Sequence, residues 1–220
     1  MNRGNRDLFA FYTAFATLAV ISLALPLGIP TGWRAFGLVL IHAVGLPLLA
    51  MARRHDDLVS ILRFTWPLSI FMLLPDWFLS AILGTLVFPD DGAPRLDTMP
   101  LAMAFMWAIP LTVSTWVGHR WNSAWIAGFT GLAIFLSSEA FAPALGLWKP
   151  TDAATLVGGV AVYVLPAEWL LAFITYQVWQ RGREDALARR AFDGFLVALT
   201  YLGALGVGYL VVERWISGLF

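Results

Sequence analysis

The stretch 72-MLLPDWFLSAILG-84 places one acidic side chain, Asp76, in the middle of an apolar run. No Lys, Arg or His lies within twelve residues of Asp76 on either side. An aspartate at the centre of a membrane helix costs roughly 2.5–3.5 kcal/mol on insertion scales. Two later stretches repeat the arrangement, with Glu139 in LSSEAF and Glu168 in LPAEWLL. We therefore expect these three acids to carry the function, with the rest of the chain as their scaffold.

The composition is that of a membrane protein. The 220 residues are 60% hydrophobic and 13% charged, and the mean hydropathy is +0.75, whereas a soluble domain has about 25% charged residues. We predict an all-α polytopic membrane protein, with residues 1–220 forming a single transmembrane domain in the cell (inner) membrane. The chain has no cysteine, which excludes disulfides and thiolate metal sites. Its zero net charge and lack of a basic run argue against nucleic-acid binding.

Seven apolar segments are predicted to cross the membrane. The third is too long for one straight crossing of about 20 residues, and it contains Pro67 and Pro75, so we expect a kinked or strongly tilted helix there. The predicted spans are residues 8–29, 34–51, 59–88, 100–117, 121–141, 155–179 and 191–212.

The distribution of basic residues predicts the orientation of these spans, because cytoplasmic loops carry the excess of Lys and Arg. The side that contains the N-terminus has ten: Arg3, Arg6, Arg53, Arg54, Arg63, Arg120, Arg181, Arg183, Arg189 and Arg190. The other side has four: Arg34, Arg95, Lys149 and Arg214. The N-terminus is therefore expected in the cytoplasm and the C-terminus outside.

Spans three and four resemble spans five and six at an offset of 62 residues. Gly84 in SAILGTLVFPD matches Gly146 in APALGLWKPTD, and Asp76 falls within one residue of Glu139. Both pairs of spans begin on the cytoplasmic side, so the repeat would be parallel. It predicts that Asp76 and Glu139 occupy related places in two helix hairpins that face one cavity.

The same offset also relates the second helices of the two hairpins. Trp107 in AFMWAIP matches Trp169 in PAEWLLA. Where the second hairpin has Glu168, the first has Met106, so the expected site is asymmetric.

Acids in a low-dielectric pocket point to proton chemistry. Burial favours the neutral carboxyl group, and so does a second carboxyl group nearby. A neutral acid can protonate an alkene, while an ionised neighbour stabilises the cation or removes a proton. Aromatic faces would stabilise the carbocation, and the candidates for this lining are Trp77, Phe78, Trp107, Tyr163 and Trp169. The alternative is that each acid only ties helices together through hydrogen bonds.

His42 is the one histidine within a predicted span, and we count it among the candidate substrate-binding residues. It could act as a proton shuttle, although a hydrogen-bonded core histidine is the simpler interpretation. No second histidine within a span completes a metal site, and neither a metal nor a cofactor is expected. Asp90, Asp91 and Asp97 lack the D-D-x-x-D spacing of diphosphate-metal sites, which disfavours a prenyl-diphosphate transferase.

The block from Glu139 through ALGLWKP to GGVAVYVLPAEWLLAFITYQVW resembles the carotenoid-cyclase domain of membrane-bound lycopene cyclases. In that family an acid near a helix end precedes a G-[IL]-W-like turn and an LP-x-E-E-hydrophobic helix. The same layout occurs in carotenoid hydratases of the bacterioruberin type, and the chain is also similar to small seven-span terpene cyclases that make meroterpenoids. The resemblance covers about half the chain. It departs at Trp169, where the family has a second glutamate after the one matched by Glu168.

The resemblance implies a cofactor-independent cyclase or hydratase that acts inside the membrane on a long isoprenoid, a carotenoid or a prenylated aromatic. Glu139 and Glu168 match the family's acids, and Asp76 is the repeat counterpart. A second hypothesis is a non-catalytic membrane subunit that binds a carotenoid, quinone or lipid. A third, a small transporter, is disfavoured because the predicted repeat is parallel. The expected partners are a lipophilic isoprenoid and membrane lipids, with homo- and hetero-oligomers both left open.

Overall fold

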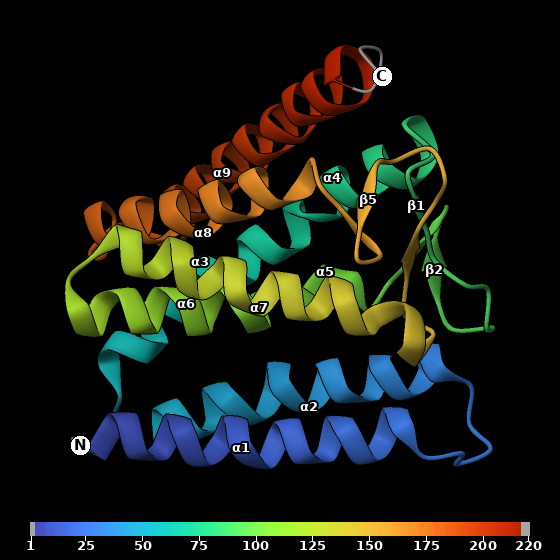
Figure 1. The fold of residues 1–220 in the computed structure, drawn as a ribbon. Coiled ribbons are helices and arrows are strands. Elements are labelled where there is room, and N and C mark those ends of the chain that lie inside the picture. Colours follow the sequence, from blue (N-terminus) through green and yellow to red (C-terminus); the bar gives the residue numbers. More distant parts are fainter. Residues whose placement is uncertain (1–2, 217–220) are drawn as a thin grey trace.

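The computed structural model describes residues 3–216, which form long helices with three two-stranded sheets gathered at one end (Figure 1). The α-helices are α1 (Arg3–Ala24), α2 (Thr31–Ala52), α3 (Asp56–Phe71), α4 (Leu73–Trp77), α5 (Met103–Met106), α6 (Ala108–Trp121), α7 (Ala124–Leu145), α8 (Val164–Arg181) and α9 (Leu187–Tyr209). Two π-helices, η1 (Phe78–Ile82) and η2 (Leu210–Ile216), continue α4 and α9.

The strands are two residues each and pair in three antiparallel ladders. β2 (Arg95–Leu96) pairs with β3 (Met99–Pro100), and β5 (Leu156–Val157) pairs with β6 (Val160–Ala161), so each of these ladders is a local hairpin. β1 (Leu86–Val87) instead pairs with β4 (Lys149–Pro150), which joins two distant parts of the chain. We call the end of the molecule that carries these strands the strand end. The opposite end, where α1 begins, is the N-terminal end (Figure 1).

The chain is an all-α membrane protein. Within residues 3–216, five helical stretches are long and apolar enough to cross a bilayer, and large apolar side chains are exposed on their outer faces. Such surfaces suit contact with lipid. The five stretches are Gly4–Ala24, Thr31–Ala52, Asp56–Ile82, Ala124–Leu145 and Leu187–Trp215.

The other two predicted spans correspond to shorter helices. Residues 100–117 contain α5 and most of α6, and α6 has only 14 residues. The predicted span 155–179 begins too early, because residues 156–161 form the β5–β6 hairpin. Gly158 and Gly159 close its turn with φ of 62° and 85°, a conformation that favours glycine. The helix of this segment, α8, starts only at Val164.

The third predicted span, residues 59–88, is not one straight helix. The α-helical hydrogen-bond pattern of α3 ends at Phe71, resumes in the short helix α4, and then widens into the π-helical turn η1. Pro67 lies inside α3 and Pro75 inside α4, so each removes one backbone donor from the helix. The helical stretch ends at Ile82 rather than at residue 88, and Gly84 turns the chain with φ of 64°.

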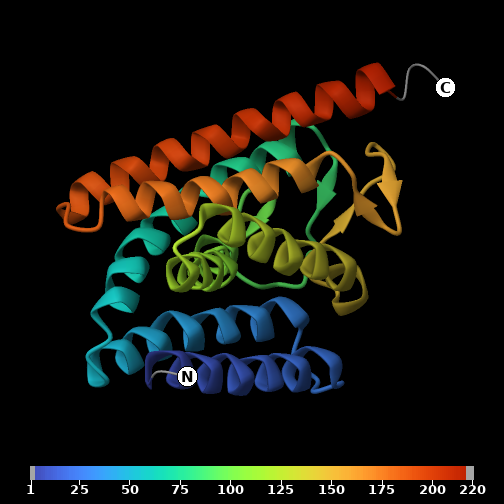
Figure 2. The same ribbon diagram turned by 60° about the vertical axis from the view of Figure 1, so that its left-hand side comes forward.

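The helices form layers that position the cavity described below. The α1–α2 hairpin forms one layer, α6 and α7 lie above it, and α8 and α9 cover the far side (Figures 1 and 2). The α7–α8 contact is unusually close, because a Cβ atom added at Gly131 would lie 2.2 Å from the Cβ of Ala172. Small residues at such contacts let membrane helices approach one another closely.

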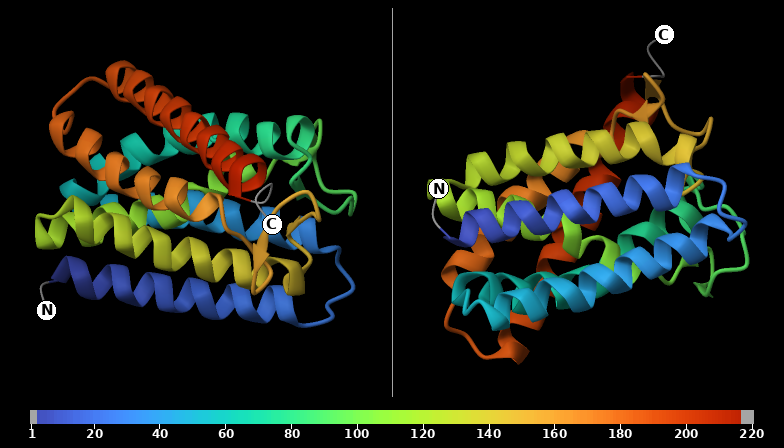
Figure 3. Two further views of the ribbon diagram at one scale, coloured as in Figure 1. Left: turned by 45° about the horizontal axis from the view of Figure 1, so that its top comes forward. Right: turned by 90° about the horizontal axis from the view of Figure 1, so that it is seen from below.

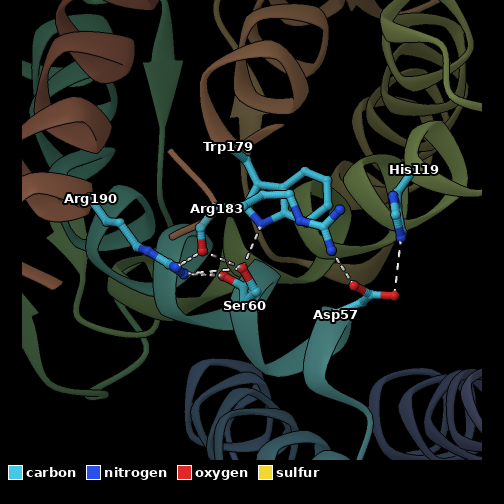
Figure 4. A network of polar contacts seen from close by, with 6 residues as sticks. All are labelled: Asp57, Ser60, His119, Trp179, Arg183 and Arg190. Atoms are coloured by element: carbon cyan, nitrogen blue, oxygen red, sulfur yellow. Dashed lines mark hydrogen bonds and ion pairs between the residues drawn. The ribbon is translucent and has the colours of Figure 1, made fainter. Parts of the chain in front are cut away.

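Charged side chains tie the helices together at the N-terminal end (Figure 4). Arg190 at the start of α9 donates hydrogen bonds to the carbonyl oxygens of Ser60 (3.0 Å) and Arg183. Asp57 of α3 pairs with Arg183 and, at 3.2 Å, with His119 of α6. This network joins α3, α6, α9 and the α8–α9 loop outside the apolar core.

Candidate functional site

A cavity of about 1390 Å³ lies between the α1–α2 hairpin and the rest of the helices. Its walls are mostly apolar and aromatic, and the charged side chains among its lining residues are Asp76, Glu139 and Glu168. No Lys, Arg or His of the described chain lines it. The structure therefore brings all three acids that the sequence singles out to one cavity.

Each of the three acids comes from a different helix and lies near the strand end. Asp76 lies on α4, two residues before η1 begins. Glu139 lies six residues before the end of α7, and Glu168 lies four residues after the start of α8. At 1.5 Å per residue these positions are about 6–9 Å inside the helix ends. Asp76 and Glu168 are only 2% and 3% exposed, and Glu139 is half-buried.

The hydrogen bonds of the three carboxyl groups differ. The indole nitrogen of Trp107 donates to Oδ2 of Asp76 (2.8 Å), and that of Trp148 donates to Oε1 of Glu139 (3.0 Å). An indole N–H can only donate, so it suits an ionised carboxylate, which can only accept. Oε2 of Glu168, in contrast, is buried without a hydrogen-bond partner in the described chain.

Aromatic rings line the cavity beside the acids. Trp107 contacts Phe135 and Tyr201, with ring centroids 5.4 and 5.7 Å apart. Tyr163 is fixed by a hydrogen bond of 2.7 Å between its hydroxyl and that of Thr85. Of the expected aromatic lining, Trp107 and Tyr163 face the cavity.

The other three aromatic candidates lie outside the cavity lining. Trp77 points toward the loop after η1, where its indole nitrogen donates to Asp97 (2.9 Å), and Phe78 packs against the apolar core. Trp169 stacks on Phe173 in the outer α7–α8 contact. The physical reason is helical geometry, because a residue next to an inward-facing acid is rotated by about 100° around the helix axis.

His42 is a buried core histidine outside the cavity lining. Its Nε2 lies 3.1 Å from the hydroxyl of Tyr12, and its ring contacts Phe11 and Phe15. Tyr12 itself lines the cavity. His42 thus fastens α2 to α1 and reaches the cavity only through Tyr12.

Sequence reasoning did not single out Tyr201 or Trp148. Tyr201 of α9 is buried, lines the cavity, and packs against Trp107, the indole partner of Asp76. A signal was present, since Tyr201 carries a hydroxyl group in the apolar segment 191–212. Trp148 lies in the loop after α7, and no sequence pattern predicts that it turns back to Glu139.

The described residues contain no group of three or more His, Cys, Asp and Glu side chains that could hold a metal ion. The cavity can instead enclose a large apolar molecule and present it with carboxyl groups in two settings. Two of them accept a hydrogen bond from an indole, and one has a buried oxygen without a partner.

No curated protein matches the chain, and no solved structure does. The sequence model of the family described as domain of unknown function DUF6989 matches residues 73–212, well over half of the chain. The matched segment begins at α4 and includes Asp76, Glu139 and Glu168 together with both of their indole partners. The chain belongs to the DUF6989 family.

Proposed function

We propose that the protein catalyses the acid-driven cyclisation or hydration of a long isoprenoid, a carotenoid or a prenylated aromatic, inside the cell (inner) membrane and without a cofactor. The observation that carries the proposal is the meeting of Asp76, Glu139 and Glu168 in one aromatic cavity that no basic side chain of the described residues lines. Three carboxyl groups that share an apolar site without a cation cannot all be ionised. At least one therefore holds a proton that it can donate.

The hydrogen bonds suggest which carboxyl group does what. Glu168 receives no indole hydrogen bond at Oε2 and is the proton donor in our proposal. The O–H bond of the Glu168 carboxyl group breaks as a new C–H bond forms on a substrate alkene. This leaves Glu168 as a carboxylate and the substrate as a carbocation. In cyclisation, a second double bond of the same chain attacks the cation and forms a ring bond. Asp76 or Glu139 then removes a proton to restore an alkene, and that proton returns to Glu168 before the next turnover.

Hydration follows the same first step. A water molecule adds to the cation instead of the second double bond, and a carboxylate takes the excess proton from the added oxygen. In both reactions the faces of Trp107, Phe135 and Tyr201 support the positive charge through cation–π attraction. The apolar remainder of the wall limits the water that can quench the cation.

We further propose that α4–α6 and α7–α8 derive from a parallel two-helix repeat. The ladder β1–β4 supports this, because it pairs Val87 with Lys149, an offset of 62 residues. Gly84 and Gly146, also 62 apart, both have positive φ (64° and 68°).

The hydrogen bonds of the following loops support the repeat with a small change of register. Leu101 donates to the carbonyl of Pro94 (2.8 Å), and Val162 donates to that of Thr155 (3.0 Å), an offset of 61 residues. At this offset the counterpart of Glu168 is Trp107 rather than Met106, and Trp107 is the residue that holds Asp76. Asp76 and Glu139 are 63 apart, and the π-helical turn η1 accounts for an added residue between Asp76 and Gly84.

We propose seven membrane crossings, with α5–α6 and α8 as two inner spans beside the five apolar ones. The bends that precede α3, α7 and α9 lie at the N-terminal end, and the strands lie at the other (Figures 1 and 2). The basic residues next to these bends, such as Arg53, Arg120 and Arg181, support a cytoplasmic N-terminal end. The C-terminus would lie outside.

The test compares purified wild-type protein with Glu168→Gln and Asp76→Asn, using lycopene and a prenylated hydroquinone as trial substrates beside lipids extracted from the wild-type protein. Loss of a positioned acid is expected to lower turnover by roughly 10²–10⁴-fold. The matched control is Asp97→Asn, which removes a carboxylate that binds Trp77 outside the cavity and should leave turnover unchanged. Full turnover in Glu168→Gln would overturn the proposal.

A binding subunit without turnover is the second candidate. Trp169 favours this candidate, because it replaces the second glutamate of the cyclases that the sequence resembles. Its ring packs against Trp125 and Phe173, away from the cavity. A pigment or quinone that co-purifies at a near one-to-one ratio and is not converted would support this function. A product found in cells with the protein and missing from a deletion strain would support the enzyme.

A further inference from the structure

We propose that the cavity takes its ligand sideways from the bilayer, through a slot between α1 and α7, as a linear apolar chain that lies along α1 with one end at the acids. The inference rests on the proposed function only where it identifies the apolar ligand as the isoprenoid that reacts. The slot itself requires no chemistry.

One edge of the slot is formed by α7. Phe129, Ala133, Ser137 and Phe141 all line the cavity, and all are exposed at the surface. They recur every four residues and therefore form a single stripe along the helix. The rings of Phe129 and Phe141 are 59% and 64% exposed. Side chains that border a cavity and the exterior at once mark an opening, so the cavity opens along this stripe.

The other edge is formed by α1. Phe9, Ala16 and Val20 also line the cavity while being exposed. α1 packs mainly on α2, and only 6% of its span is buried in the described structure. Seen from below, α1 lies between α2 and α7 in projection (Figure 3), and α1 and α7 both line the cavity. Both edges belong to helices that are apolar and long enough to cross a membrane, so the opening faces lipid rather than water.

The shape of the cavity selects the ligand. Its α1 wall runs from Asn5 to Leu23, about 27 Å at 1.5 Å per residue, which approaches the roughly 30 Å of a hydrocarbon core. The three carboxyl groups lie at the strand end of this length, and no other charged side chain in the described part of the chain lines the cavity. An extended hydrocarbon chain fits an apolar wall of this length. A charged head group does not, because it would be buried there without a basic partner.

The experiment uses the absence of cysteine from the chain. Val20→Cys and Phe141→Cys place one thiol on each edge, at similar distances from the N-terminal ends of α1 and α7. A bismaleimide that joins them closes the slot. The control pair, Phe11→Cys and Gly45→Cys, joins α1 to α2, since a Cβ at Gly45 would lie 3.3 Å from the ring of Phe11. The control leaves the slot open.

The full-length protein is placed in phosphatidylcholine vesicles that contain a photoactivatable long-chain alcohol, and labelled residues are identified by mass spectrometry. Without cross-linking, we expect label on Met103 and Met106 inside the cavity and on lipid-facing Val207 of α9. Closing the slot should lower the cavity label at least tenfold and leave that on Val207 unchanged. Cross-linking the control pair should leave both the cavity label and the label on Val207 unchanged.

Two results would overturn the slot. One is cavity labelling that persists when α1 and α7 are joined, and the other is an unmodified protein labelled at Val207 but never in the cavity. A second variant, Ala133→Trp, fills the slot without a cross-linker and should also lower the cavity label. Its matched control is Leu136→Trp, because Leu136 is exposed on the same helix without lining the cavity. Equal cavity label in both variants counts against the slot.

The same labelling separates this inference from the proposed function. Glu168→Gln should retain the cavity label, because the slot does not involve the acids. A wild-type protein that accepts the probe through the slot but converts no substrate would contradict the enzyme and leave the slot intact.

Discussion

The closest contact between two helices that carry acids gives a prediction with a calculable size. In Gly131→Ala, the new Cβ would lie 2.2 Å from the Cβ of Ala172, whereas two such carbons prefer about 3.5–4.0 Å. The helices α7 and α8 must therefore separate locally by about 1.5 Å. Overpacking of this kind costs about 1–3 kcal/mol. Alanine gains about 0.5–1 kcal/mol over glycine in a helix, so the free energy of unfolding should fall by up to about 2.5 kcal/mol.

The matched control is Gly203→Ala on α9, where nothing lies within 4 Å of the added Cβ. This variant should gain the helix preference without the clash and be at least as stable as the wild type. Both are compared by reversible unfolding in detergent micelles, followed by circular dichroism. Gly131→Ala should also lose turnover, because α7 and α8 carry Glu139 and Glu168. Equal stability of the two variants would refute the reasoning that this contact is close-packed.

Three further predictions test the site and its frame. Trp107→Phe keeps an aromatic ring but removes the donor to Asp76. A hydrogen bond to a charged group is worth about 1.5–3 kcal/mol, so turnover measured by product chromatography should fall about 10–100-fold. An unchanged rate would contradict the role of the indole. Arg190→Met removes the guanidinium donor to the carbonyl oxygens of Asp185 and Ser60. The free energy of unfolding in urea should fall by about 1–3 kcal/mol. An unchanged midpoint would show that the network contributes nothing. Gly146 has a φ of 68°, so Gly146→Ala should lower the free energy of unfolding by about 1–2 kcal/mol. Gly37→Ala, where nothing lies within 4 Å of the added Cβ, should not lower it. Equal melting temperatures of the two variants would argue against strain at Gly146.

The meeting of the acids was predictable from the sequence, because a carboxyl group in an apolar run needs a polar neighbour or a cavity. Asp76, Glu139 and Glu168 satisfy that need together. Their aromatic neighbours were predicted only in part. Trp107 and Tyr163 face the cavity, while Trp169 does not. A helix that is apolar on every face gives no sign of which face turns inward, because that depends on its contacts with other helices.

The spans show a similar division. The long apolar helices follow from composition, and each of the five that are found overlaps one predicted segment. The beginning of α8 was missed because residues 156–161 are as apolar as a helix, and only Gly158 and Gly159 indicate the turn that makes them a hairpin. The fastening of Glu139 by Trp148 depends on how the loop folds back, which local sequence does not specify.

The π-helical turn η1 also determines the angular setting of Asp76. An α-helix advances by about 100° per residue, and a π turn accommodates one residue more than an α turn between fixed ends. Deleting one residue within Phe78–Ile82 would restore regular winding and rotate Asp76 by about a quarter-turn relative to Gly84 and β1. The carboxyl group would then point toward a neighbouring helix, so the aim of this acid depends on a single surplus residue in the chain.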